Sequence, residues 1–419
     1  MLRSALFALA LLAGCAQNPL TGRSQLMLVS ESQAVIGSAQ AYSQMMGQFD
    51  KKKQIETGTP RVEKVREITE RLIAQAVRFR PETASWSWDV QLIDDPKTVN
   101  AFCMAGGKMA IYSGMWEKLK ATDDEVAQVM GHEIGHALAN HTQERMSVAM
   151  ATSVALQVAA ISVSSRSNSP AAGLALSGAA LAAAVAIQLP NSRESEAEAD
   201  QIGIELAARA GYDPKAAVTL WDKMGKLDGG KAPPEFLSTH PAPENRAAHL
   251  KQLGTKVEPL YLAAKDKAHD APRFLVAKEG AVSKPGEMTR EQYAAKVAKE
   301  GDAMTFQADA FNRFRGGQTV LECRADCSAG YAVRKGGWRE LHERQSWRDL
   351  AISVLQVGYL SDLSYFMLAE SAQGLGLHDA AAAYYRRALE AGKEYGCGGA
   401  GFSCEGFEVQ KLAAAAVRK

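Results

Sequence analysis

Two histidines and a glutamate stand together in the run His132-Glu133-Ile134-Gly135-His136. In a helix, residues four apart share one face, so both imidazoles can bind the same Zn²⁺ ion. Glu133 lies about 100° further round the helix, where its carboxylate can reach a water that the metal activates. These residue types in this spacing indicate a hydrolytic zinc site with Glu133 as the base. The alternative is a pair of core histidines that only form hydrogen bonds within the fold.

A helix start precedes this motif. Thr122 is followed three residues later by Glu125, which is the spacing of a capping box. Apolar residues follow at helical intervals, namely Val126, Val129 and Met130. The sequence therefore predicts that both histidines lie on one well-started helix.

A catalytic zinc site usually has three protein ligands and an open position, so a third ligand is needed. The metzincin spacing would require histidine at 142, but the chain has Thr142, and His141 falls on the wrong side of the predicted helix. A second helix with an acidic first turn is predicted after Ser192. In a His-His-Glu site, Glu196 would bind the metal, and Asp200 would accept a hydrogen bond from the far nitrogen of a ligating histidine. On its own, such an acidic run is more often a solvated helix start.

Five spaced motifs resemble those of the gluzincin peptidases of the HtpX and CAAX prenyl protease type, and most of all the periplasmic beta-barrel assembly-enhancing protease type. They occur in the family's order between about residues 18 and 253: Asn100-Ala101-Phe102 with Gly106-Gly107-Lys108, Ser113-Gly114, His132-Glu133-x-x-His136, Ser192-Arg193-x-x-Glu196-x-x-Ala199-Asp200, and Ser238-Thr239-His240-Pro241 with Arg246. The resemblance implies one Zn²⁺ per chain, held by His132, His136 and Glu196. It selects Glu196 over Glu194 and Glu198. It also implies an α+β, predominantly helical fold, with a gluzincin zinc-peptidase core and a small antiparallel sheet.

His240 and Arg246 follow the acidic helix. Pro241 restricts His240 to an extended conformation, which can hold its ring towards the cleft. If this loop covers the zinc, His240 would fill the fourth position, displace the water and leave a latent enzyme. Arg246 would then stabilise the oxyanion once substrate displaces the loop. The alternative is that His240 caps a turn and Arg246 pairs with a surface carboxylate.

Residues 98–104 and 108–112 read as two short strands. An edge strand at Asn100, Ala101 and Phe102 would pair with an extended peptide, whose main chain supplies most of the affinity. This mode suits unfolded or misassembled proteins as substrates. The alternative is that Asn100 and the glycines after the strand only close a hairpin.

The N-terminus resembles a bacterial lipoprotein signal. Arg3 precedes an apolar run that ends in Leu12-Ala13-Gly14-Cys15, so we expect a signal peptide at 1–15 and lipid on Cys15. The lipid would hold the protein at a membrane, and Gln17 favours the outer membrane, facing the periplasm. The alternatives are an ordinary signal peptide with an incidental cysteine, or a short membrane anchor, although the run is too short to span.

The other cysteines suit an oxidising compartment: Cys103, Cys323, Cys327, Cys397 and Cys404. Two disulfides and one free thiol fit best. Pairing of Cys397 with Cys404 would close a Gly-rich loop, while cross-pairing among the C-terminal cysteines stays open. A cysteine metal site is the sharper alternative, but the spacing does not match the usual pairs.

The 419 residues have a net charge of +1 and are 47% hydrophobic, which allows two globular domains and points to no nucleic acid partner. We expect a peptidase domain at 16–264, a linker at 265–286 and an α-helical domain at 287–419. Within the last, 365–391 resembles a tetratricopeptide (TPR)-like hairpin, for which ordinary packing and a protein partner are both open. The nearly uncharged stretch 148–189 is expected to be a buried or membrane-apposed helical hairpin rather than two spans.

These features predict a zinc metalloendopeptidase of the cell envelope that cleaves misfolded or misassembled envelope proteins. Glu133 would take a proton from the attacking water and pass it to the leaving amine. The alternative is a non-proteolytic periplasmic chaperone or assembly scaffold with the same fold. The intact Glu133 favours the enzyme, since a binding module needs no base.

Overall fold

The chain divides by its internal contacts into two units, Leu26–Tyr293 and a second unit made of Met1–Gln25 with Ala294–Lys419. Each unit is described by itself. The predicted segment 1–14 and residues 266–286 of the predicted linker lie outside the described part. The predicted domain boundaries stay a prediction. The computed structural model describes residues 15–18, 20–164, 190–227, 235–241, 245–265, 292–293, 295–297, 304, 308–323, 328–397 and 403–418.

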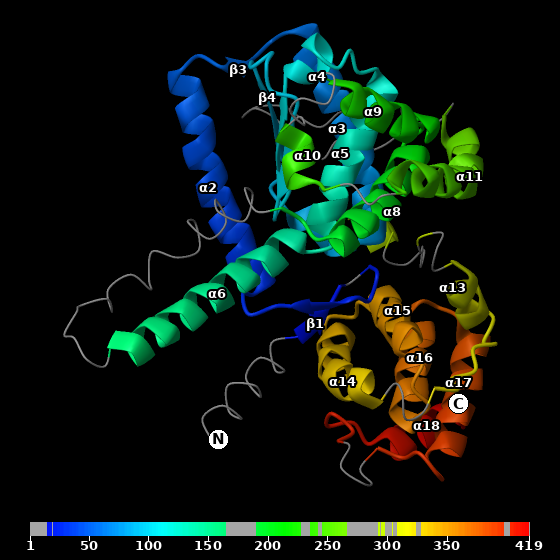
Figure 1. Cartoon of the computed structure of the whole chain (residues 1–419). Coiled ribbons are helices and arrows are strands. Elements are labelled where there is room, and N and C mark those ends of the chain that lie inside the picture. Colours follow the sequence, from blue (N-terminus) through cyan, green and yellow to red (C-terminus); the bar gives the residue numbers. More distant parts are fainter. Residues whose placement is uncertain are drawn as a thin grey trace. The chain divides into compact units, whose positions relative to one another are not determined.

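The Leu26–Tyr293 unit is mainly helical (Figure 1). Its helices are α2 (Glu31–Lys51), α3 (Pro60–Phe79), α4 (Gly114–Glu117), α5 (Asp123–Leu138), α6 (His141–Ser164), α8 (Arg193–Arg209), α9 (Lys215–Lys226), α10 (Glu235–Thr239) and α11 (Arg246–Ala264), with a 3₁₀ turn, η1, at Pro81–Ser85. Helix α5 packs against α3, α8 and α9. Almost every side chain of α5 is buried, which makes this helix the centre of the unit.

A small sheet covers another side of α5. Its strands are β3 (Ile55–Glu56), β4 (Asp89–Ile93), β5 (Ala101–Met104) and β6 (Lys108–Tyr112), in the order β3-β4-β6-β5. The predicted α+β, mainly helical fold is confirmed, but the sheet is mixed rather than antiparallel. The β5–β6 hairpin inserts β6 beside β4, and these two strands run parallel. Strand β5 is therefore left at an edge of this sheet and packs on α5.

Three glycines bring α5 and α8 close together. A Cβ atom on Gly131 would lie 2.8 Å from the carbonyl oxygen of Gly203, and one on Gly135 would lie 2.9 Å from that of Ala199. A Cβ on Gly203 would lie 2.6 Å from the backbone nitrogen of His132. Contacts this short leave no room for a side chain. The missing side chains thus let the acidic helix α8 cross directly over the histidine motif.

The second unit is a helical bundle. Its helices are α13 (Ala308–Arg315), α14 (Ser328–Glu343), α15 (Trp347–Val357), α16 (Asp362–Gly374), α17 (His378–Ala391) and α18 (Val409–Val417). Helices α16 and α17 form the expected hairpin, and they pack around a core that includes Phe314, Trp338, Phe366 and Tyr384. At the N-terminal side, β1 (Cys15–Gln17) pairs with β2 (Ser24–Leu26).

Helix α6 covers the first part of the nearly uncharged stretch 148–189, whose residues 165–189 lie outside the described part. Among the helices that are described, none is long and apolar enough to cross a membrane. The predicted hairpin therefore stays a prediction.

Candidate metal centre

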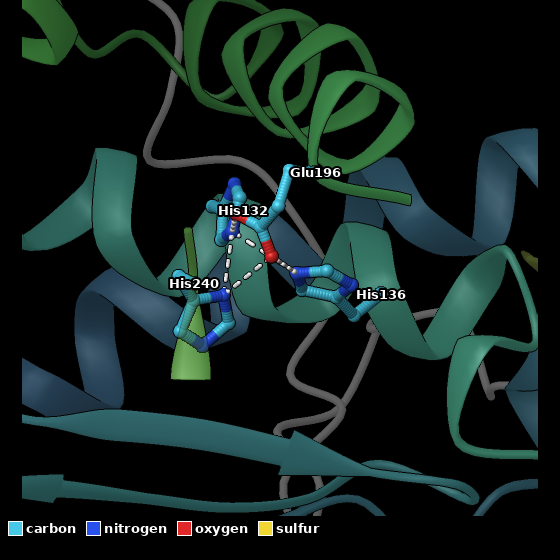
Figure 2. Close-up of side chains that lie close together, drawn as sticks. All are labelled: His132, His136, Glu196 and His240. Atoms are coloured by element: carbon cyan, nitrogen blue, oxygen red, sulfur yellow. Dashed lines mark hydrogen bonds and ion pairs between the residues drawn. The ribbon is translucent and has the colours of Figure 1, made fainter. Parts of the chain in front are cut away.

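Four buried side chains converge on one point in the Leu26–Tyr293 unit. They are His132 and His136 from α5, Glu196 from α8 and His240 from the segment that follows α10. One nitrogen or oxygen of each lies within 4.8 Å of the others. Figure 2 shows the three imidazoles facing the Glu196 carboxylate from different directions.

The spacing of these atoms fits a tetrahedral metal ion. The Nε2 atoms of His132 and His136 lie 3.0 Å apart, and each is 3.3–3.4 Å from an oxygen of Glu196. Ligands placed about 2.0 Å from zinc at the corners of a tetrahedron are about 3.3 Å apart. The two nitrogens face each other in a buried site, so either a proton or a metal ion must lie between them. The donor set of imidazoles and a carboxylate is the one that zinc prefers.

Local signals in the sequence position each of these residues. Thr122 and Glu125 form the predicted capping box, with the Thr122 hydroxyl accepting from the Glu125 amide and the Glu125 carboxylate accepting from the Thr122 amide. Ser192 caps α8 in the same way by accepting from the Ser195 amide. The backbone N–H of Asn191 donates to the backbone carbonyl of Thr239. This bond connects the start of α8 to the segment that carries His240.

On the His132 side, carboxylates and an arginine surround the outer ring nitrogen. Nδ1 of His132 lies 3.0 Å from Oδ1 of Asp200, as the sequence predicts for a group that fixes the tautomer. Arg246 donates to Asp200 at 2.6 Å and to Glu196 at 3.0 Å. Its guanidinium stacks on Trp221, with Cζ 3.5 Å from the ring centroid. Arg246 thus clamps the two carboxylates together.

On the His136 side, a second imidazole occupies the place that Asp200 has beside His132. Nδ1 of His136 lies 2.7 Å from Nδ1 of His141, and Nε2 of His141 lies 3.0 Å from Oε2 of Glu198. When Nε2 of His136 binds a metal, its Nδ1 carries a proton and donates it to His141. His141 then donates from Nε2 to Glu198. Neither role is predicted from the sequence, in which His141 is considered only as a metal ligand and Glu196 is preferred to Glu198.

Glu133 is next to the cluster without belonging to it. Its Oε1 lies 3.4 Å from Nε2 of His240 and has no hydrogen-bond partner among the described residues. Burial raises the pKa of Glu133, although His240 and His132 lower it. A carboxylate with a raised pKa is a stronger proton acceptor, as a general base requires.

The surroundings shift the pKa values of the two candidate histidine ligands in opposite directions. Burial lowers the pKa of His132, but Glu196 and Asp200 outweigh it and raise that pKa to about 9. Burial lowers the pKa of His136 well below its usual value. Burial also raises the pKa of Glu196, but the histidines around it hold that pKa far below its usual range. Glu196 is therefore a permanent anion at the centre of the cluster.

A cavity of about 140 Å³ opens beside the centre. Its lining includes Glu133, His136 and His240, together with residues 100–104 on and before the edge strand β5. The predicted edge residues Asn100, Ala101 and Phe102 are therefore next to the cluster. Asn191, which the sequence analysis also missed, points its Nδ2 atom at Nδ1 of His240 at 3.2 Å.

The predicted cysteines are not among the four converging residues. Cys397 and Cys404 form a disulfide, and Cys323 is also disulfide-bonded. Cys103 is a free buried thiol. Cys327 and the side chain of Cys15 lie outside the described part.

Comparison with known proteins agrees with this centre. The family model for peptidase family M48 matches residues 60–254, which include all four converging residues. A mitochondrial metalloendopeptidase, OMA1 of Arabidopsis thaliana, is 38% identical over 176 residues, which are 42% of this chain and 33% of the relative. The metalloprotease LoiP of Escherichia coli is 36% identical over 155 residues, which are 37% of this chain and 58% of the relative.

The beta-barrel assembly-enhancing protease of Escherichia coli is 31% identical over 172 residues, which are 40% of this chain and 35% of the relative. The chain thus spans between a third and three-fifths of the length of these relatives. The segment of this chain that matches peptidase family M48 contains the whole metal centre, and the metallopeptidases of that family use zinc.

Proposed function

We propose that this protein is a zinc-dependent metalloendopeptidase. The observation that carries the proposal is the convergence of His132, His136 and Glu196 on one point, with the Glu133 carboxylate beside it, whose Oε1 accepts no hydrogen bond from the described residues. In this assignment the three converging residues hold the zinc, while Asp200 and His141 fix the tautomers of the two histidines. The related M48 proteins that are named metalloendopeptidases support the same activity.

Zinc bound here supplies Lewis acidity, which activates a water and polarises the scissile carbonyl. Glu133 accepts the proton of the attacking water and returns it to the leaving amine. Its burial favours this task, because it raises the pKa of Glu133. Glu196 stays ionised throughout, since the histidines that surround it hold its pKa low.

His240 gives the centre a latent form. Its Nδ1 lies 2.8 Å from Oε1 of Glu196 and 3.3 Å from Nε2 of His132, distances that suit a fourth ligand. In that arrangement His240 takes the place of the water, and substrate must displace it before Glu133 can act. Arg246 can stabilise an oxyanion only after release from Glu196 and Asp200, so here it orients the two carboxylates.

Extended segments of unfolded or misassembled proteins are the proposed substrates. The edge strand β5 lines the cavity and offers its main chain to a substrate strand. A cell-envelope location follows from the lipobox-like run before Cys15, with lipid anchoring in the outer membrane as the finer proposal. The name of one relative refers to beta-barrel assembly, which agrees with misassembled envelope proteins as substrates.

Digestion of unfolded casein tests the activity. The zinc-loaded wild type should cleave it, and Glu133→Gln should lose at least about 100-fold in rate while it retains zinc, since Gln keeps the shape but accepts no proton. Glu67→Gln, a change on the surface of α3, serves as the matched control. Equal activity of wild type and Glu133→Gln would overturn the proposal and favour a binding scaffold.

A further inference from the structure

The wall of the cavity formed by α6 contains polar atoms with no partner in the fold. Thr142 and Arg145 are one turn apart on α6, and both line the cavity. The hydroxyl of Thr142 and Nε of Arg145 are buried, and neither has a hydrogen-bond partner among the described residues. Buried donors without acceptors are costly, so native proteins keep them mainly where a ligand supplies the acceptor.

Arg145 is also a partly buried cation that has no anion beside it among the described residues. Within the described part of the chain, no carboxylate lies at ion-pair distance from its guanidinium, and its one neutral hydrogen-bond partner is Oδ1 of Asn191. Burial lowers the pKa of Arg145, although the charges of Glu133 and Glu196 raise it. Arg246, in contrast, is fully buried and pairs with two carboxylates. A partly buried guanidinium that lines a cavity and has no carboxylate partner is suited to binding an anion.

The position of Asn191 decides which part of a substrate Arg145 can reach. The carbonyl of the Asn191 side chain accepts from Arg145, and its Nδ2 faces His240 at 3.2 Å and His136 at 3.5 Å. The side-chain amide of Asn191 therefore lies between the Arg145 guanidinium and the two histidines of the metal centre. With Asn191 between Arg145 and the two histidines, we expect Arg145 to meet a side chain next to the reacting carbonyl rather than the carbonyl itself.

Another part of the cavity lining indicates how that side chain would enter. It consists of residues 100–104, on and before the edge strand β5. A substrate strand paired with β5 projects alternate side chains to either face. The volume of about 140 Å³ suits one side chain of moderate size.

We propose that Arg145 and Thr142 form a subsite for a substrate carboxylate, so that the enzyme prefers an aspartate or glutamate within two residues of the scissile bond. This inference rests on the proposed peptidase function. The guanidinium supplies two donors to the carboxylate, and the Thr142 hydroxyl supplies a third. Apolar residues on the other wall, such as Phe102 and Met104, pack against the stem of the acidic side chain.

Peptide cleavage by the full-length zinc-loaded protein tests the subsite. Cleavage sites in casein are first mapped by mass spectrometry, and the best site is then made as fluorogenic peptides with Glu or Gln at each of the four flanking positions. At one position the wild type should prefer Glu over Gln by about tenfold in kcat/KM, the usual scale of a charged hydrogen bond. Arg145→Gln should remove the preference and change cleavage of the Gln peptide less than threefold.

Two further variants refine this test. Arg145→Lys should retain part of the preference, because it keeps the charge without the planar fork. Arg61→Gln, which removes an arginine that pairs with Glu117 at the surface, should behave as wild type. A uniform loss of cleavage of both peptides in Arg145→Gln would mean that Arg145 acts on the reacting carbonyl, and this would overturn the subsite. No preference at any position in the wild type would overturn it as well.

Binding separates failure of the subsite from failure of the peptidase function. The anisotropy of labelled casein-derived peptides that differ only in Glu or Gln at one position is measured with Glu133→Gln protein, and the Glu peptide of at least one pair should bind about tenfold more tightly than its Gln counterpart. This preference should disappear when Arg145→Gln is added. Preferential binding without any cleavage by the wild type would refute the peptidase and leave the subsite standing. Equal binding of both peptides would refute the subsite, whether or not they are cleaved.

Discussion

His132 and His136 have the same chemical task on neighbouring turns of α5, but the fold supports them differently. His132 has a carboxylate, Asp200, directly on its outer nitrogen at 3.0 Å. His136 has a neutral imidazole, His141, at 2.7 Å, and the Glu198 carboxylate lies behind that imidazole. One histidine is therefore oriented by an adjacent charge and the other by a charge that acts through an intervening ring.

The two sides also differ in what surrounds them. On the His132 side, Arg246 stacks on Trp221 and forms ion pairs with the carboxylates of Glu196 and Asp200. His136 faces the cavity, next to Asn191 and within reach of the edge strand. The closed side suits metal retention, and the open side suits substrate. We therefore expect substitutions on the His132 side to change zinc affinity more than substitutions on the His136 side.

The largest effect should come from Glu196, the ligand that both sides share. Glu196→Ala should weaken zinc binding roughly 1,000-fold, because a four-ligand zinc site binds with about 10–16 kcal/mol in total, several kcal/mol per ligand. Chelator competition with metal analysis measures this change. Glu194→Ala, an exposed neighbour on the same helix, is the control. Full zinc in the Glu196→Ala protein would mean that another residue is the third ligand.

The direct comparison is Asp200→Asn against Glu198→Gln. Asp200→Asn removes the charge beside His132 and leaves Arg246 without one of its two carboxylates, so zinc affinity should fall about 10–100-fold. Glu198→Gln acts on His136 only through His141, and its effect should be about threefold. Asp222→Asn, on the exposed face of α9, controls for the loss of one charge. Equal losses for Asp200→Asn and Glu198→Gln would refute the asymmetry.

Much of the zinc site could be predicted because its signals are local. The capping box at Thr122, the cap at Ser192 and the spacing of the histidines each fix an element within a few residues. Strand β6 was predicted with its observed limits for the same reason. The parallel pairing of β4 with β6 had no local signal, because it depends on where a hairpin inserts in the sheet.

His141 does not join the metal cluster, but its contact with His136 could not be predicted, and the reason is physical. The helical count from His136 assumes an uninterrupted helix, but α5 ends at Leu138 and Asn140 adopts a φ of 58°. The left-handed residue reverses the chain, and α6 begins at His141 with its ring turned back to His136. Arg145 and Asn191 come together from segments 46 residues apart, and no spacing rule links them. Contacts of this kind appear only when the two helices are packed.

Substitution of Gly203 tests whether the close crossing of α5 and α8 keeps His132 in place. Gly203→Ala would put a Cβ within 2.6 Å of the His132 backbone, so α5 and α8 must separate. We expect a loss of about 1–3 kcal/mol in the free energy of unfolding and weaker zinc binding. Gly225→Ala on α9 has free space around its Cβ and should gain up to about 1 kcal/mol from helix propensity. Urea unfolding of both proteins makes the comparison, and a neutral Gly203→Ala would show that the crossing tolerates expansion.

The last comparison concerns His240, where the two sides meet. Its Nδ1 faces His132, Glu196 and Asn191, and its ring stacks on Phe236 with centroids 4.2 Å apart. Stacking and three polar neighbours hold the ring in place, so the latent form should dominate in the resting protein. If the ring occupies the centre in about nine of ten molecules, His240→Ala should raise basal proteolysis about tenfold, because it removes the competing state.

Zinc content in His240→Ala should stay near that of the wild type, since His132, His136 and Glu196 remain. Phe236→Leu is the matched variant: it removes the stacking partner but keeps the imidazole, and a smaller activation of the same sign should follow. Initial rates on unfolded casein, with zinc measured in the same samples, give both quantities. Unchanged rates in His240→Ala would refute the latent form and leave His240 as a structural link between α10 and the start of α8. A loss of zinc together with activity would make His240 a permanent ligand, and the centre would then have no position for the water that Glu133 deprotonates.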